Sequence, residues 1–138
     1  MEIKLKRKND KFNFEATNEG GQIVEIDANP AIGGGGKGFR PMEMMLVGLG
    51  GCSGIDMVNI LTKQKEALTD IQIDIHATRR TEEPPIFEVI DINFDLYGEL
   101  NEQKVQRALN LTFEKYCSVA NILSRSAKIN FTYSINKP

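Results

Sequence analysis

Two cysteines, Cys52 and Cys117, are the residues of this 138-residue chain best suited to covalent chemistry. The thiolate is the reactive form of cysteine, and a helix N-terminus stabilises it. Cys117 lies where one predicted helix ends and Ser118 opens another, while Cys52 follows Gly50-Gly51 in an apolar segment. Each glycine weakens a helix by about 1 kcal/mol relative to alanine, so this pair indicates close approach by another element. The alternative is that both cysteines are ordinary small core residues.

His76 is the only histidine, and it lies on the polar side of a predicted strand, as a surface residue would. A single histidine, so placed, argues against a Cys–His nucleophile pair and against a histidine-rich metal site. Two isolated cysteines do not make a zinc site either. No metal and no cofactor are therefore expected.

The strands that must position the cysteines follow from alternating apolar and polar residues. The first 28 residues predict an antiparallel meander of three short strands, and further strands are expected at 71–76, 87–97 and 129–136. The apolar pair Phe87 and Val89 has the opposite parity to the residues from Ile90 onward, which predicts a bulge or burial on both sides there. Strands and helices come in groups rather than in regular alternation, which indicates an α+β fold.

Helices are predicted in three places. One runs from Pro41 to about Glu66, because proline suits the first helical turn. A second begins at an Asn101 N-cap and carries a core-facing stripe as far as Tyr116. A third runs from a cap at Ser118 to Leu123. The loop from 29 to 38, with four consecutive glycines, predicts a flexible connector or an active-site flap.

The helix from Met42 is apolar on nearly every side, which is typical of a helix that is buried on nearly every side. Its length also suits a membrane span. Glu43, Asp56, Asn59 and four glycines argue instead for burial within protein. Because a monomer of this size cannot easily enclose such a helix, we expect a second subunit to cover part of it.

The composition is that of an ordinary globular protein, with 41% hydrophobic and 26% charged residues and a formal net charge of -2. This length predicts one domain over residues 1–138. The lack of a basic stripe argues against nucleic-acid binding. Met1 leads directly into charged alternation and not into a secretory signal, so a cytoplasmic location is expected. Cysteines there are usually reduced or catalytic.

Two motifs resemble those of the OsmC/Ohr family, the osmotically induced and organic hydroperoxide resistance proteins. They are Arg40-Pro41-Met42-Glu43 with Leu49-Gly50-Gly51-Cys52-Ser53, and Tyr116-Cys117-Ser118-Val119-Ala120. The order of the expected elements is also similar to that family, so the resemblance covers essentially the whole chain. It implies an α+β, OsmC-like fold with antiparallel sheets, a long buried central helix and an intertwined homodimer.

The resemblance also implies roles for the two thiols. Cys52 would be the peroxidatic thiolate that attacks an organic hydroperoxide and becomes a sulfenic acid. Cys117 would resolve that sulfenic acid to a disulfide. An external dithiol would then restore both thiols.

Arg40 and Glu43 complete the expected catalytic set. Family peroxidases carry an activating arginine on the loop after the first strand, whereas residues 8–11 here contain lysines and no arginine. Arg40, beside the helix start, is a possible substitute cation, with Arg125 a weaker one. Glu43 lies one position later than the family glutamate, a change of about 100° around a helix.

Three functional hypotheses follow. The first is a thiol-dependent peroxidase for organic hydroperoxides, with an apolar pocket from Met44, Met45, Leu46 and a partner subunit. The second is a non-catalytic OsmC-like dimer that binds a small hydrophobic or thiol-reactive ligand. The third is a structural dimer with inert cysteines. None of them involves nucleic acid or a membrane.

Overall fold

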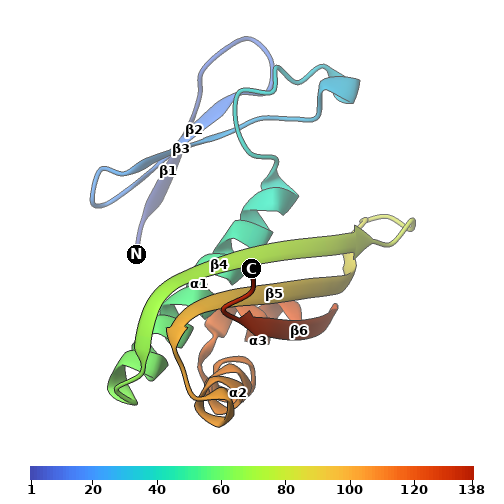
Figure 1. Cartoon of the computed structure of the whole chain (residues 1–138). Helices are drawn as coiled ribbons and strands as arrows, with labels where there is room; N and C mark the ends of the chain where they lie inside the picture. The colour runs from blue at the N-terminus through green and yellow to red at the C-terminus, as the bar shows by residue number, and fades with distance from the viewer. The chain divides into compact units, whose positions relative to one another are not determined.

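The computed structural model describes residues 1–138 as two compact units, Met1–Val47 and Gly48–Pro138 (Figure 1). A long helix, α1 (Pro41–Lys63), begins in the first unit and continues through the second. Its start agrees with the helix expected from Pro41, and it ends at Lys63, slightly before the expected Glu66. The single domain expected over 1–138 stays a prediction.

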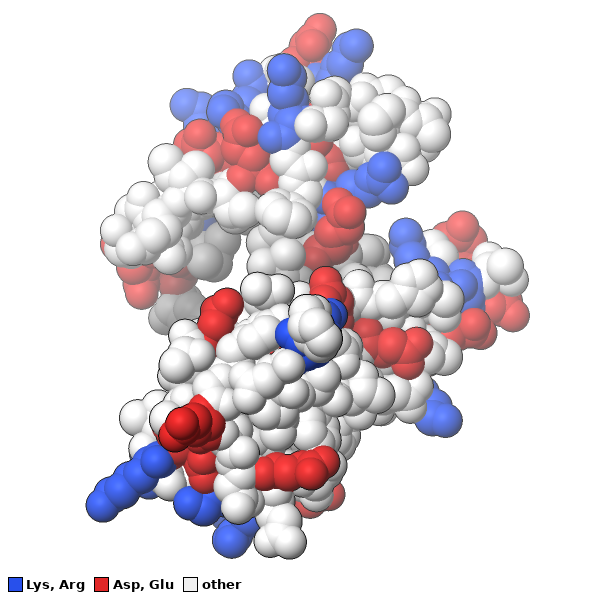
Figure 2. All heavy atoms as spheres, viewed as in Figure 1, with Lys and Arg blue, Asp and Glu red and all other residues white.

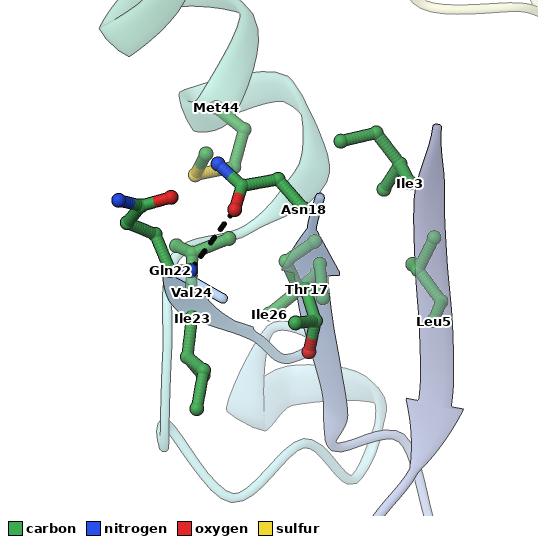
Figure 3. Close-up of a pocket in the computed structure, with 10 residues that line it drawn as sticks. Ile3, Leu5, Thr17, Asn18, Gln22, Ile23, Val24, Ile26 and Met44 are labelled. Atoms are coloured by element: carbon green, nitrogen blue, oxygen red, sulfur yellow. Dashed lines mark hydrogen bonds between the residues drawn. The ribbon is translucent and has the colours of Figure 1, made fainter. Parts of the chain in front are cut away.

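The first unit contains a three-stranded antiparallel meander, as its alternating sequence predicts. The strands are β1 (Ile3–Arg7), β2 (Phe14–Asn18) and β3 (Ile23–Ile26), paired in that order. The Asn18 side chain accepts the backbone N–H of Gln22 at 2.9 Å and closes the hairpin between β2 and β3 (Figure 3). The confirmed alternation places apolar side chains together on one face of this sheet.

That face lines an apolar groove of about 420 Å³ within the first unit (Figure 3). Met44, from the first turns of α1, contributes its side chain to this groove. The strands contribute mainly aliphatic residues, among them Ile3, Leu5, Ala16, Val24 and Ile26. The groove is the part of the first unit best shaped to receive an apolar side chain or ligand.

The glycine-rich loop of the first unit is organised around one buried carboxylate. Asp27 accepts the backbone N–H groups of Ala28 at 2.7 Å and Lys37 at 3.1 Å. These hydrogen bonds, the one from Lys37 first, lower the pKa of Asp27. Gly34 lies so close to Ala28 that an added Cβ would sit 1.8 Å from its carbonyl oxygen. Close backbone packing therefore requires glycine at this position, and the role of the loop as a flap stays a prediction.

The second unit holds a mixed sheet in the order β4 (Ala67–Arg79), β5 (Phe87–Glu99) and β6 (Lys128–Ile135). β4 and β5 pair antiparallel, and their register shifts between Thr78 and Arg79, opposite Val89 and Phe87. The bulge expected at this point is confirmed.

The expectation of antiparallel sheets is wrong for one strand, because β6 runs parallel to β5. A parallel partner needs a long crossover. Here the crossover consists of α2 (Glu102–Leu111), the π-helical turn η2 (Thr112–Tyr116) and α3 (Ser118–Leu123). Asn101 caps α2 by accepting the N–H of Lys104 at 3.1 Å, as predicted. Tyr116, expected in the core-facing stripe, is 49% exposed, because the chain leaves the regular α-helix before reaching it.

Within the second unit, α1 packs against β4 through glycine. A Cβ added at Gly54 would lie 2.8 Å from the Cδ1 atom of Ile73, and one at Gly50 would lie 3.2 Å from that of Ile75. Gly54 is therefore the position at which the helix most needs to lack a side chain. The approach that the sequence predicts at Gly50-Gly51 occurs at Gly50, and the strand that approaches is β4.

One copy of the chain leaves much of α1 uncovered. The helix is long and apolar enough to cross a membrane by length and composition alone, and 28% of its most apolar window is buried. Ile55 is 71% exposed, and Val58 is 41% exposed. The sequence predicts that α1 is buried on nearly every side. One copy of the chain does not bury it in this way.

Asp95 on β5 is a buried carboxylate with three polar partners. It accepts hydrogen bonds from Asn93 at 2.9 Å, Ser134 at 2.7 Å and Lys137 at 2.8 Å, and it is 2% exposed. The hydrogen bond from Lys137 comes first among the causes that lower the pKa of Asp95 from 3.8 to about 2. The network fastens the C-terminal residues to the middle strand.

We therefore expect an acid-sensitive contribution to stability from Asp95. The folded-state pKa lies below the unfolded value, so this contribution is present above about pH 4 and is lost as the pH falls toward 2. Asp95→Asn should lower the free energy of unfolding at pH 7 and reduce its fall between pH 4 and 2. Urea titrations at several pH values measure both, with the exposed Glu88→Gln as control. Parallel pH profiles for wild type and Asp95→Asn would contradict the assignment.

Candidate redox site

Cys52 and Cys117 lie together within the second unit, although they are far apart in the sequence. The two sulfur atoms and a carboxylate oxygen of Asp56 all lie within 4.8 Å of one another. Cys52 comes from α1, and Cys117 comes from the junction of η2 and α3. Both cysteines are free thiols. The packing of α1 against the crossover thus creates a site that neither element forms alone.

Cys117 itself caps α3, which corrects the expected cap at Ser118. Its backbone is extended, with φ -72° and ψ 103°, as an N-cap requires, whereas Ser118 is already the first helical residue. The Cys117 Sγ atom accepts the N–H of Ala120 at 3.4 Å. The thiol is 3% exposed. The cap fixes the direction of this sulfur toward the interior of the site.

Burial raises the pKa of the Cys117 thiol to about 11. Burial is the first cause of this pKa shift; the neighbouring Cys52 and Asp56 side chains act in the same direction, while the Ala120 N–H opposes them. Cys117 therefore keeps its proton at neutral pH.

Asp56 is the member of this group that the sequence reasoning missed. It follows Cys52 by four residues, the spacing that places two side chains on one face of a helix. Its Oδ2 atom is shielded from solvent and accepts no hydrogen bond from the chain. Burial raises the pKa of Asp56. The Cys52-to-Asp56 spacing was visible in the sequence, but only the packing of the crossover shows that this face of the helix meets Cys117.

A cleft of about 270 Å³ opens beside Asp56. Its lining mixes polar and apolar side chains, as small-molecule sites do, and includes Asp56 but neither cysteine. The other lining residues are Asn59, Ile60, Lys63, Gln64, Leu111 and Tyr116. Lys63, in the last turn of α1, supplies the one positive charge of this lining.

The other expected site residues lie elsewhere. Glu43 accepts the backbone N–H of Arg40 at 2.8 Å, the return hydrogen bond of a capping box at the start of α1, in the first unit. This bond gives Glu43 a structural role, and the action of Arg40 and Glu43 on Cys52 stays a prediction. Arg125 is exposed just after α3. His76 is exposed on β4, as expected of a surface histidine.

The charged side chains do not form a single-sign surface on the face in view. Figure 2 shows Lys and Arg interspersed with Asp and Glu between broad uncharged regions. This distribution agrees with the near-neutral net charge of -2. It is unlike the basic stripe of a protein that binds the nucleic-acid backbone.

Fold and sequence together define the class of this protein. The family model described as OsmC-like protein matches residues 34–132, which include both cysteine motifs. The chain therefore belongs to the OsmC-like family, and the resemblance found in its motifs is confirmed.

Three known proteins show what this chain is similar to. Protein YhfA from Escherichia coli strain K12 is 37% identical over 125 residues, which cover 90% of each chain. A hypothetical protein from Aquifex aeolicus is 30% identical, with a TM-score of 0.86 and 98% and 95% of the two chains covered. An organic hydroperoxide resistance protein from Elizabethkingia anophelis has a TM-score of 0.74 over 99% and 97% of the chains, at 14% identity. This last likeness concerns the fold alone.

The geometry predicts that the two thiols form an intramolecular disulfide on mild oxidation. A disulfide has an S–S length of about 2.05 Å, so the sulfurs need only a small local movement from their present separation. We expect diamide to remove two hydrogen atoms from the wild-type chain, as measured by intact-protein mass spectrometry without reductant.

Cys52→Ser and Cys117→Ser should each block this change and leave one alkylatable thiol. Tandem mass spectrometry of the oxidised wild type should recover one peptide pair that joins the two cysteines. Oxidation that yields only chain-to-chain disulfides would contradict the predicted pairing.

Proposed function

We propose that this protein is a thiol-dependent peroxidase that reduces organic hydroperoxides. The observation that carries the proposal is the pairing of two free thiols within 4.8 Å beside a small cleft. Membership of the OsmC-like family supports it, as does the similar fold of a protein named for organic hydroperoxide resistance. The two sulfurs act one after the other in the proposed reaction.

In the first step, the Cys52 thiolate attacks one oxygen of the hydroperoxide, and the O–O bond breaks. The sulfur is oxidised to a sulfenic acid, and the peroxide is reduced to an alcohol after its alkoxide takes up a proton. Cys52 takes this part because Cys117 is the more buried thiol and keeps its proton. The thiolate needs a nearby positive group, and we assign this role to Arg40, with Glu43 to orient it.

In the second step, the Cys117 sulfur attacks the sulfenic sulfur of Cys52. The S–S bond forms, the S–O bond breaks, and the oxygen leaves as water with the Cys117 proton. An external dithiol then reduces the disulfide by thiol–disulfide exchange and is itself oxidised. Such a cycle suits a reducing compartment, and we therefore propose a cytoplasmic location.

We also propose that the protein acts as a homodimer. Within the second unit, α1 and β4 line a shallow apolar groove of about 590 Å³, which includes Gly51, Gly54, Ile55 and Val58. Ile55, one of its lining residues, is 71% exposed. Because an exposed apolar face favours association, we propose that the same face of a second copy covers it. The apolar lining expected from Met44, Met45 and Leu46 would be completed by that copy.

We predict that the reduced protein consumes cumene hydroperoxide with dihydrolipoamide as the dithiol. Cys52→Ser should abolish this turnover, because the variant has no sulfur to accept the peroxide oxygen. A coupled assay that follows dihydrolipoamide oxidation measures the rate.

Cys117→Ser is the matched control, since it removes the other sulfur and leaves the first step possible. It should give one stoichiometric burst of alcohol and a Cys52 sulfenic acid that a dimedone probe labels, but little turnover. Arg40→Ala should slow the burst, whereas Arg125→Ala should leave it unchanged. Equal turnover by wild type and Cys52→Ser would reject the peroxidase.

Dimer formation has its own test. Ile55→Lys places a charge at the centre of the proposed interface, where it would have to be buried without a partner. We expect light scattering after size exclusion to shift from the mass of two chains to that of one. Ile122→Lys changes a similarly exposed isoleucine on α3, 63% exposed, and should remain dimeric. A wild-type monomer, or an Ile55→Lys dimer as stable as wild type, would refute this interface.

A second candidate function is that of a non-catalytic dimer that binds a small hydrophobic or thiol-reactive ligand. The apolar groove of the first unit favours it, since about 420 Å³ suits a small molecule. This function would leave cumene hydroperoxide unconsumed, and native mass spectrometry would detect a retained ligand.

A further inference from the structure

We infer that Cys52, Asp56 and Cys117 form a binding site for a thiophilic divalent cation, of which Zn²⁺ is the representative. The proposal begins from their geometry. A tetrahedral zinc ion with Zn–S distances of about 2.3 Å and a Zn–O distance of about 2.1 Å holds its ligand atoms about 3.6 to 3.8 Å apart. The two sulfurs and the carboxylate oxygen already lie within 4.8 Å of one another. Small side-chain rotations would bring the three onto one ion.

The local charge gives a second, independent reason. Asp56 takes part in none of the ion pairs of the chain. Its Oδ2 atom is shielded from solvent without a hydrogen-bond donor from the chain. A buried carboxylate is costly unless it is paired or coordinates a metal. With two thiols beside it, a divalent cation is the partner that satisfies all three groups together.

The donor set selects the kind of cation. Thiolate sulfur is a soft ligand that favours zinc and other thiophilic ions, whereas Mg²⁺ and Ca²⁺ prefer sites made of oxygen. Three protein ligands leave the fourth position of a tetrahedral ion for water, and the cleft beside Asp56 provides the access. Two cysteines do not suffice for a zinc site, as the sequence indicated. Asp56 supplies the third ligand.

Metal binding would have a consequence for the proposed function, although the metal site does not depend on that function. A bound cation holds both sulfurs as thiolates and releases their protons to solvent. Neither sulfur is then free to attack a peroxide or to form the disulfide. Zn²⁺ would therefore inhibit the proposed peroxidase reversibly, and oxidation of the thiols would expel the ion.

The test uses Co²⁺ as a spectroscopic probe for the Zn²⁺ site in the fully reduced protein, with a phosphine reductant that carries no thiol. We expect one Co²⁺ per chain, a thiolate-to-cobalt charge-transfer band, and loss of that band when Zn²⁺ is added. Asp56→Asn keeps the size of the side chain and removes its charge. It should weaken Zn²⁺ binding at least about tenfold, the minimum effect of losing even an outer partner of a metal ligand.

Asp74→Asn is the matched control, because Asp74 is exposed on β4 outside this cluster, and its affinity should equal that of wild type. Cys52→Ser and Cys117→Ser should each reduce the charge-transfer band. Wild-type protein oxidised by diamide should bind no ion, a test that needs no substitution. The proposal is overturned by the absence of a stoichiometric Co²⁺ complex, by undiminished Zn²⁺ affinity in Asp56→Asn, or by binding to the oxidised protein. A protein without peroxidase activity could still bind the ion, so the two proposals fail separately.

Discussion

The parallel pairing of β6 with β5 is the constraint on which the thiol site depends. An antiparallel strand could have followed a short turn, but a parallel one must return to the same end of the sheet. The crossover of α2, η2 and α3 makes this return and carries Cys117 with it. Cys117 thereby meets Cys52 on α1. A feature of sheet topology thus brings together two sulfurs that a great length of sequence separates.

The same junction makes the surroundings of the two thiols different. Cys117 ends the irregular η2 turn, and its sulfur is held as the N-cap of α3 by the Ala120 N–H. That cap favours charge on the sulfur, but burial opposes it and is the larger effect on the pKa of Cys117. A cap that orients a thiol need not ionise it. Position and reactivity are therefore divided between the two cysteines, with Cys117 fixed and protonated and Cys52 more accessible on the helix.

Much of this architecture could be predicted from the sequence, because it depends on local periodicity. Alternation gave the meander and the strand at β4, Pro41 marked the start of α1, and a change of parity located the bulge near Val89. The parallel direction of β6 could not be predicted, since the alternation of a strand carries no information about its partner. Residue type favours Ser118 as the N-cap of α3, but the backbone angles show that Cys117 is the N-cap.

The role of Asp56 shows a different limit. In the sequence, Asp56 is a polar residue within an apolar helix, and this position argues only against a membrane span. Its spacing from Cys52 places both on one side of α1, but several other residue pairs of that helix have the same spacing. Only the contact with Cys117, which comes from the crossover, selects this pair.

The sides of α1 have different surroundings in this chain. Gly50 and Gly54 face β4, whereas Cys52, two residues from Gly50, is turned by about 200° toward the crossover. Ile55 lies between these directions, where the chain supplies no cover. A helix with apolar residues on every side is thus explained without a membrane. One side packs on a strand, one holds the thiols, and the third is exposed in this chain. A second copy, which we propose to pack on this third side, would also limit the access of water to the helix that carries Cys52.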